Sequence, residues 1–124
     1  RAKTAYVQSI AILNKFVLRW ESYRQIPERE RWMRLDLGGG FEEMLRTTNT
    51  HAEELLEFIS ANEAVMEKGV VIQGRLIFDL MKKFTRSEVI AHHESELEQM
   101  ESNGRAAYDA AKALLSYLKQ TKTI

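Results

Sequence analysis

Apolar side chains recur along most of this chain at alternating spacings of three and four residues. Side chains at these spacings share one face of an α-helix, whereas a half-buried strand alternates at every second residue. The chain of 124 residues contains a single proline and six glycines, so few positions interrupt the pattern. The pattern therefore predicts an all-α fold.

The first long helix is expected over residues 3–24. A stripe with spacings of four and three residues forms its buried face and consists of Tyr6, Ile10, Leu13, Val17 and Trp20. A short helix should follow over residues 27–35, because the fixed φ angle of Pro27 suits a first helical turn.

A glycine run, Gly38 to Gly40, separates the short helix from the second long one. It lacks the lysine that completes a nucleotide-binding P-loop, and no strand precedes it. Glu42 and Glu43 would also repel a phosphate from the start of the next helix. We therefore interpret the run as a hinge, with a flexible joint and an anion site as the weaker alternatives.

The second long helix is expected to begin at Phe41 and to continue to Met66, with Gly69 available to end it. A break near Ser60 is the alternative, because Ser60 and Glu63 have the spacing of a capping box.

The last two long helices are expected to form an antiparallel hairpin. One has its apolar face from Val70 to Phe84. The other begins after a very short turn, where Thr85 and Glu88 have capping-box spacing. Its repeat of three and four residues continues without a break to Leu118.

Together these elements predict an up-down four-helix bundle with a short extra helix between the first and second long helices and a long C-terminal helix. Residues 1–124 should form one domain, since a chain of this length buries a core without the help of a metal or disulfides. The chain opens with Arg1 and not with Met, so we expect it to be part of a longer protein.

Charge alternates in sign along the chain. Basic residues dominate in residues 1–25, 69–86 and 105–124, whereas acidic residues dominate in 41–68 and 87–104. Antiparallel neighbours of opposite sign attract each other modestly, by about 0.2–1 kcal/mol for each exposed ion pair. The pattern therefore helps to select the register of the helices.

Composition removes several classes of function. The chain is 44% hydrophobic and 29% charged, which is usual for a globular protein, and its formal net charge is zero. Because it has no cysteine, it has no thiol nucleophile, disulfide framework or cysteine-ligated metal. The longest uncharged stretch, residues 4–14, is shorter than the roughly 18 apolar residues of a membrane span. These features favour a cytoplasmic protein.

Arginines lie among aromatic residues in the segment 19–34, as in many nucleic-acid-binding surfaces. Acidic residues lie among them as well, and a net charge of zero opposes binding to a phosphate backbone. We therefore expect no nucleic-acid partner.

Two histidines each precede a glutamate by three residues, as His51 with Glu54 and His93 with Glu96. Each pair shares a helical face, and the two pairs could form a metal site if their helices converge. The chain lacks the Glu-x-x-His motifs of di-iron bundles and the usual nucleophile motifs. We therefore expect no metal, no cofactor and no enzymatic activity, and a metal-dependent enzyme is the weakest alternative.

The stretch from Gly104 to Ala113 is unusually rich in glycine and alanine for a well-patterned helix. Small side chains let another helix approach closely, either within the bundle or from a partner. The residues predicted to bind a protein partner or a second copy are Gly104, Ala107, Tyr108, Ala111, Leu114 and Leu118.

The sequence thus predicts a non-enzymatic interaction or assembly module, such as an adaptor or scaffold domain, that works through its helix faces. The alternative is a ligand-sensing regulatory bundle, in which a pocket near Tyr108 and Tyr117 holds a small apolar molecule.

Overall fold

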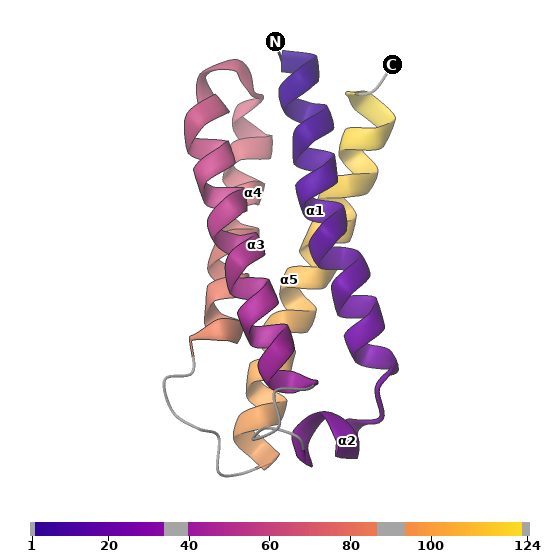
Figure 1. Ribbon diagram of the computed structural model, residues 1–124. Helices are drawn as coiled ribbons and strands as arrows, with labels where there is room; N and C mark the ends of the chain where they lie inside the picture. The colour runs from indigo at the N-terminus through magenta and orange to yellow at the C-terminus, as the bar shows by residue number, and fades with distance from the viewer. Residues whose placement is uncertain (1, 34–39, 87–93, 123–124) are drawn as a thin grey trace.

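The computed structural model describes residues 2–33, 40–86 and 94–122, and over these residues it is all-helical (Figure 1). The elements in chain order are α1 (Ala2–Gln25), α2 (Glu28–Met33), α3 (Phe41–Asn62), a 3-10 turn (Glu63–Val65), α4 (Lys68–Thr85) and α5 (Glu94–Thr121). The predicted all-α class is confirmed, and a short helix lies between the first and second long helices as expected.

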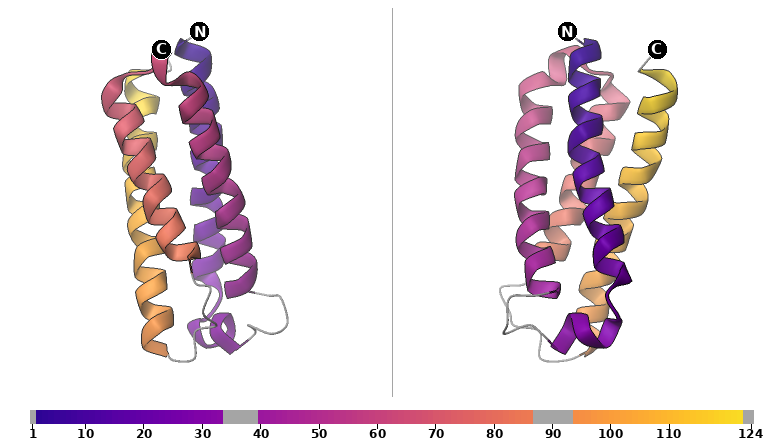
Figure 2. Two further views of the ribbon diagram at one scale, coloured as in Figure 1. Left: turned by 90° about the vertical axis from the view of Figure 1, so that its left-hand side faces the viewer. Right: turned by 45° about the vertical axis from the view of Figure 1, so that its right-hand side comes forward.

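The four long helices lie side by side. α1 packs against α3 and α5, and α4 packs against the same two helices. Consecutive long helices run in opposite directions in Figure 1, and Figure 2 shows α2 at the end of the molecule opposite to the start of α1 and the end of α5. Every long helix therefore shares the interior with two neighbours.

Aromatic side chains from three helices meet in this interior. Phe84 of α4 packs edge-on against Trp20 of α1, with ring centroids 5.4 Å apart, and against Phe41 of α3 at 6.0 Å. All three side chains are buried. Edge-to-face pairs contribute about 0.5–1.5 kcal/mol beyond the burial of their area, so this cluster holds α1, α3 and α4 together.

The fourth long helix reaches the aromatic cluster through a glycine. A Cβ atom at Gly104 of α5 would lie 2.5 Å from two ring carbons of Trp20 and 3.1 Å from Phe84. A side-chain carbon does not fit so close to a packed aromatic ring. Only glycine therefore allows the backbone of α5 to lie directly against Trp20.

The turn between α3 and α4 comes earlier than the apolar stripe predicted and lies close to the break near Ser60 that was the alternative. α3 ends at Asn62, and Gly69, which was expected to end that helix, is the second residue of α4. Met66 has an extended backbone and is buried, and the backbone N–H of Glu67 donates to Tyr6 Oη at 2.6 Å. Because Met66 is apolar and buried in the turn, the apolar stripe continues across the break and conceals it.

α3 begins at Phe41 as predicted. The preceding Gly40 has a φ angle of +61°, in the left-handed region that glycine adopts without strain. A Cβ at Gly40 would also lie 3.2 Å from the Cα of Arg31, so this glycine permits the close approach of α2. Four parts of the predictions lie outside the described residues: Gly38 and Gly39 of the hinge, residues 34 and 35 of the short helix, Glu88 of the second capping box and the residues that precede Glu94.

Ion pairs join neighbouring helices of opposite charge. Lys15 of α1 binds Glu54 of α3 at 3.1 Å, and Lys82 of α4 binds Glu53 of α3 at 2.6 Å. Surface pairs of this kind contribute about 0.2–1 kcal/mol each. The alternation of charge along the sequence thus corresponds to helices that are neighbours in space.

We predict that Gly104→Ala lowers the free energy of unfolding by about 1–3 kcal/mol, because overpacking against Trp20 outweighs the better helix propensity of alanine. Gly69→Ala is the matched control, since a Cβ there would meet only Glu67 Oε1 at 3.9 Å. That variant should gain about 0.5–1 kcal/mol. Urea unfolding of both variants measures the difference, and equal effects at the two positions would contradict the packing described for Gly104.

Candidate functional site

The residues predicted to bind a partner lie mostly inside the molecule. Five of them are buried on one side of α5, namely Gly104, Ala107, Ala111, Leu114 and Leu118. Tyr108 is half-buried and donates a hydrogen bond to Glu21 of α1 at 2.6 Å. The structure places this stripe in packing within the chain, which is one of the two alternatives that the sequence left open. A surface open to a partner has to lie on other sides of the helices.

α4 and α5 each carry a second stripe of mainly apolar or small residues, which is only partly buried. On α4 it consists of Gly69, Gln73, Leu76 and Leu80, and on α5 of Ala106, Ala110, Ala113 and Tyr117. Both stripes have spacings of four, three and four residues, so each occupies one helix face. A cavity of about 410 Å³ separates the stripes, lined mainly by Gly69, Val70, Gln73, Ala110, Ala113, Leu114 and Tyr117.

Two large apolar side chains lie beside this cavity on α4. Ile72 is 59% exposed and Leu76 is 45% exposed, and they are one helical turn apart. Both lie on the outward side of Gln73, which lines the cavity. We name this surface the α4/α5 face, and it comprises Gly69, Ile72, Gln73, Leu76, Leu80, Ala110, Ala113 and Tyr117.

A small polar cluster closes one end of the α4/α5 face. The Tyr117 hydroxyl donates to Glu67 at 2.8 Å, and Lys122 binds the same carboxylate at 2.6 Å. The hydrogen bond from Lys122 lowers the pKa of Glu67, and the bond to Glu67 raises the pKa of Tyr117. Glu67 therefore stays ionised and Tyr117 stays protonated at neutral pH, and the ring of Tyr117 is held at the edge of the cavity.

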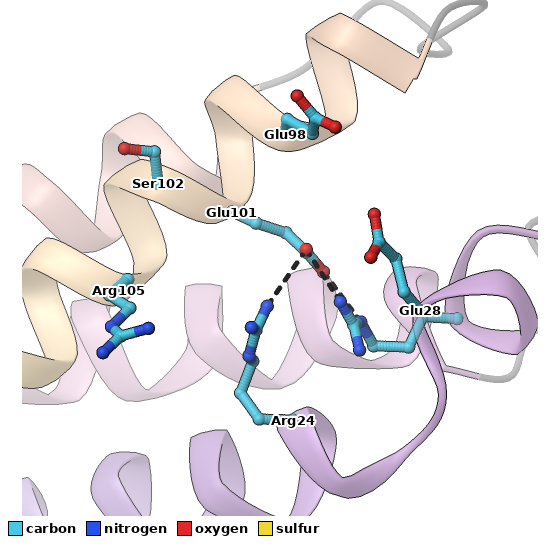
Figure 3. A pocket seen from close by; sticks show the side chains of 7 residues that line it. Arg24, Glu28, Glu98, Glu101, Ser102 and Arg105 are labelled. Atoms are coloured by element: carbon cyan, nitrogen blue, oxygen red, sulfur yellow. Dashed lines mark hydrogen bonds and ion pairs between the residues drawn. The ribbon is translucent and has the colours of Figure 1, made fainter.

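A polar cleft of about 280 Å³ lies at the end of the molecule that carries α2 (Figure 3). Glu101 of α5 is only 6% exposed and accepts two hydrogen bonds from Arg31 of α2, at 2.9 and 3.0 Å. Arg24 of α1 adds a hydrogen bond of 3.3 Å, which Figure 3 draws, and the hydroxyl of Tyr23 adds another. This one carboxylate therefore connects α1, α2 and α5.

The buried guanidinium of Arg31 has several partners besides Glu101. It is 4% exposed, it donates to the carbonyl of Ile26 at 2.6 Å, and its guanidinium lies 5.1 Å from the ring centre of Tyr23. Burial would lower the pKa of Arg31, but the hydrogen bonds and charge of Glu101 outweigh burial and raise it. Burial also raises the pKa of Tyr23, and the bond to Glu101 raises it further. At neutral pH the arginine is charged and the tyrosine is protonated.

The lining of the polar cleft has balanced charge. Its ionisable residues are three arginines and three glutamates, namely Arg24, Arg31, Arg105, Glu28, Glu98 and Glu101. Such a lining attracts neither anions nor cations as a whole, and its two most buried members bind each other. The arrangement therefore serves to hold α2 against α1 and α5.

Some of the arginines in the segment 19–34, which resembled a nucleic-acid-binding surface, form ion pairs within the chain. Arg24 and Arg31 both bind Glu101, and Trp20, which lies among them in the sequence, belongs to the core. The side chains of Arg29 and Trp32, and all of Arg34, lie outside the described residues.

His51 is half-buried on α3, and its Nδ1 has no hydrogen-bond partner within the described part of the chain. Burial lowers the pKa of His51; Lys15 and Arg19 lower it further, and Glu54 opposes them. His93 lies outside the described residues, and so does its predicted approach to His51. In the described ranges no three residues among His, Cys, Asp and Glu are grouped to hold a metal.

No protein-family model, curated protein or solved structure matches this chain. Within the described residues, no helix has the length and apolar character that crossing a membrane requires.

Sequence reasoning missed two features of these surfaces. The first is the α4 part of the α4/α5 face, which the sequence does indicate. Ile72, Leu76 and Leu80 form a second apolar face on a helix whose buried face is already complete without them. The pair of Arg31 and Glu101 has no local signal, because the two residues are 70 positions apart in the sequence.

We predict that Glu101→Gln lowers the free energy of unfolding by about 3–5 kcal/mol, because Arg31 would keep a buried charge without its carboxylate. Glu54→Gln is the matched control: it breaks the exposed pair with Lys15 and should cost less than about 1 kcal/mol. Urea unfolding measures both. The double variant Arg31→Met/Glu101→Met should recover much of the loss, and a cost at Glu101 as small as that at Glu54 would contradict the account.

Proposed function

We propose that this chain is a non-enzymatic helical interaction module, an up-down four-helix bundle that binds protein helices through the α4/α5 face. The observation that carries the proposal is the cavity of about 410 Å³ between α4 and α5, together with the exposed side chains of Ile72 and Leu76 on α4. Contiguous exposed apolar surfaces commonly mark interaction sites in folded proteins. A scaffold or adaptor role fits this surface, and the absence of cysteine suits a cytoplasmic location.

The geometry of the face suits a helix as the ligand. α4 and α5 run side by side (Figure 2), and the small residues Gly69, Ala110 and Ala113 leave the space between them open. Gln73 of α4 and Tyr117 of α5 provide walls on the two helices, and Ile72 is exposed on the outward side of α4. An amphipathic helix binds such a groove by placing its own apolar side chains, spaced three and four residues apart, between the walls.

The exposed apolar residues of α1 do not form a comparable surface. Val7 and Leu18 are exposed, but they are eleven residues apart, which is about 16 Å along the helix. Polar residues such as Asn14 and Lys15 lie between them. Isolated exposed apolar residues are normal on protein surfaces, so Leu18 serves as a control position for the α4/α5 face.

A second candidate function is the sensing of a small apolar molecule, and the same cavity favours it. Its volume of about 410 Å³ is within the usual range of ligand pockets, about 300–1,000 Å³. Of the two tyrosines that the sequence indicated for such a pocket, Tyr117 lines this cavity, whereas Tyr108 lies at a different hollow beside α1. Native mass spectrometry of the chain purified from its own cells separates the two candidates, because a sensed ligand would remain as a defined mass increment.

We predict that a photo-crosslinking amino acid at Ala113 captures a defined protein in cells that naturally contain this chain. The same probe at Ala11, an exposed alanine of α1, is the matched control and should capture none. Adding Ile72→Glu should remove the adduct at Ala113, whereas adding Leu18→Glu should leave it. Leu18 is a matched control because the two side chains are similarly exposed, Ile72 at 59% and Leu18 at 61%. Adducts of equal yield at Ala113 and Ala11 would contradict the proposal.

A further inference from the structure

The α4/α5 face is complementary to itself, and we propose that it binds the same face of a second copy of this chain with the two α4 helices antiparallel. The inference rests on the proposed function and names its partner. A twofold axis would pass close to position 74 of α4. Residues at similar distances on either side of this position would then meet across the interface.

The apolar residues of α4 have the required symmetry. Ile72 and Leu76 lie two residues on either side of position 74, so Ile72 of one copy meets Leu76 of the other. Gly69 and Leu80 lie five and six residues from it, so each Leu80 approaches the cavity beside the other copy's Gly69. Large side chains thus face gaps on the same surface, which is the shape match that a twofold contact requires.

Exposed charges on α4 follow the same symmetry. Lys68 and Asp79 lie six and five residues from position 74, and both are exposed. Neither forms an ion pair within the part of the chain that the structure describes, whereas Arg75 and Lys82 bind glutamates of their own chain. In the antiparallel arrangement Lys68 of each copy approaches Asp79 of the other.

The charges also favour the antiparallel over the parallel arrangement. With parallel α4 helices, Lys68 of one copy and Asp79 of the other would lie at different levels along the helices, so neither would approach an opposite charge. The antiparallel arrangement has two attractive contacts and also brings Ile72 onto Leu76. A twofold contact closes on itself, so it covers the apolar face in both copies and ends at a dimer.

Sedimentation equilibrium of the full chain from about 1 µM to about 1 mM tests the association. The unmodified chain should form dimers and no larger species. Ile72→Glu should leave only monomer over this range, because two buried glutamates would face apolar side chains. Leu18→Glu, which changes a side chain of similar exposure, should leave the dimer unchanged. Circular dichroism of each variant confirms that it is folded.

A charge exchange tests the register. Lys68→Glu and Asp79→Lys should each dimerise about tenfold more weakly alone, because both contacts become repulsive. Mixed in equal amounts, the two variants should form a heterodimer about tenfold tighter than either homodimer, since every contact is attractive again. Native mass spectrometry with one variant isotope-labelled identifies the heterodimer, and added salt should weaken the preference.

Three results would overturn the inference: a chain that is monomeric at every concentration, a dimer that Ile72→Glu does not weaken, or a mixture without preference for the heterodimer. These results are distinct from failure of the proposed function. A monomeric chain whose Ala113 probe captures a different protein would exclude the second copy as partner and retain the interaction module. A monomeric chain without an Ala113 adduct would contradict both the dimer and the interaction module.

Discussion

The contact between Gly104 and the Trp20 ring sets the position of α5. Which side chains of that helix are buried and which are exposed depends on this contact. A Cβ at Gly104 would lie 2.5 Å from ring carbons of Trp20, so the backbone itself forms this part of the core. With α5 held there, Ala107 and Ala111 are completely buried. The neighbouring Ala113, on another side of the same helix, is exposed beside α4 and lines the cavity.

Periodicity in the sequence was sufficient to predict the helical class and the order of the helices, because each helix buries a stripe that repeats every three or four residues. It failed at the turn after α3, because Met66 is apolar and buried in an extended segment and therefore continues the stripe. It also could not decide whether the stripe of small residues on α5 packs within the chain or against a partner. Glycine and alanine suit both kinds of contact, and only the neighbours in space show that Ala107 and Ala111 pack within the chain.

Charges in this molecule serve two purposes that the structure separates. At the α2 end, Arg31 and Glu101 are buried and bind each other, which fixes α2 against α5. On the outer side of α4, Lys68 and Asp79 are exposed and form no ion pair within the described residues. The first pair is satisfied within the chain, whereas the second is placed to select a partner and its direction.

In the proposed dimer, Ile72 of one copy meets Leu76 of the other across a twofold axis. The most direct measurement is an isotope-filtered nuclear Overhauser experiment on a dimer in which one copy has labelled isoleucine methyl groups and the other has labelled leucine methyl groups. An intermolecular contact should appear between the methyl groups of Ile72 and Leu76 and should disappear on dilution. A spectrum without this contact at concentrations where the chain is dimeric would contradict the antiparallel contact between the two α4 helices.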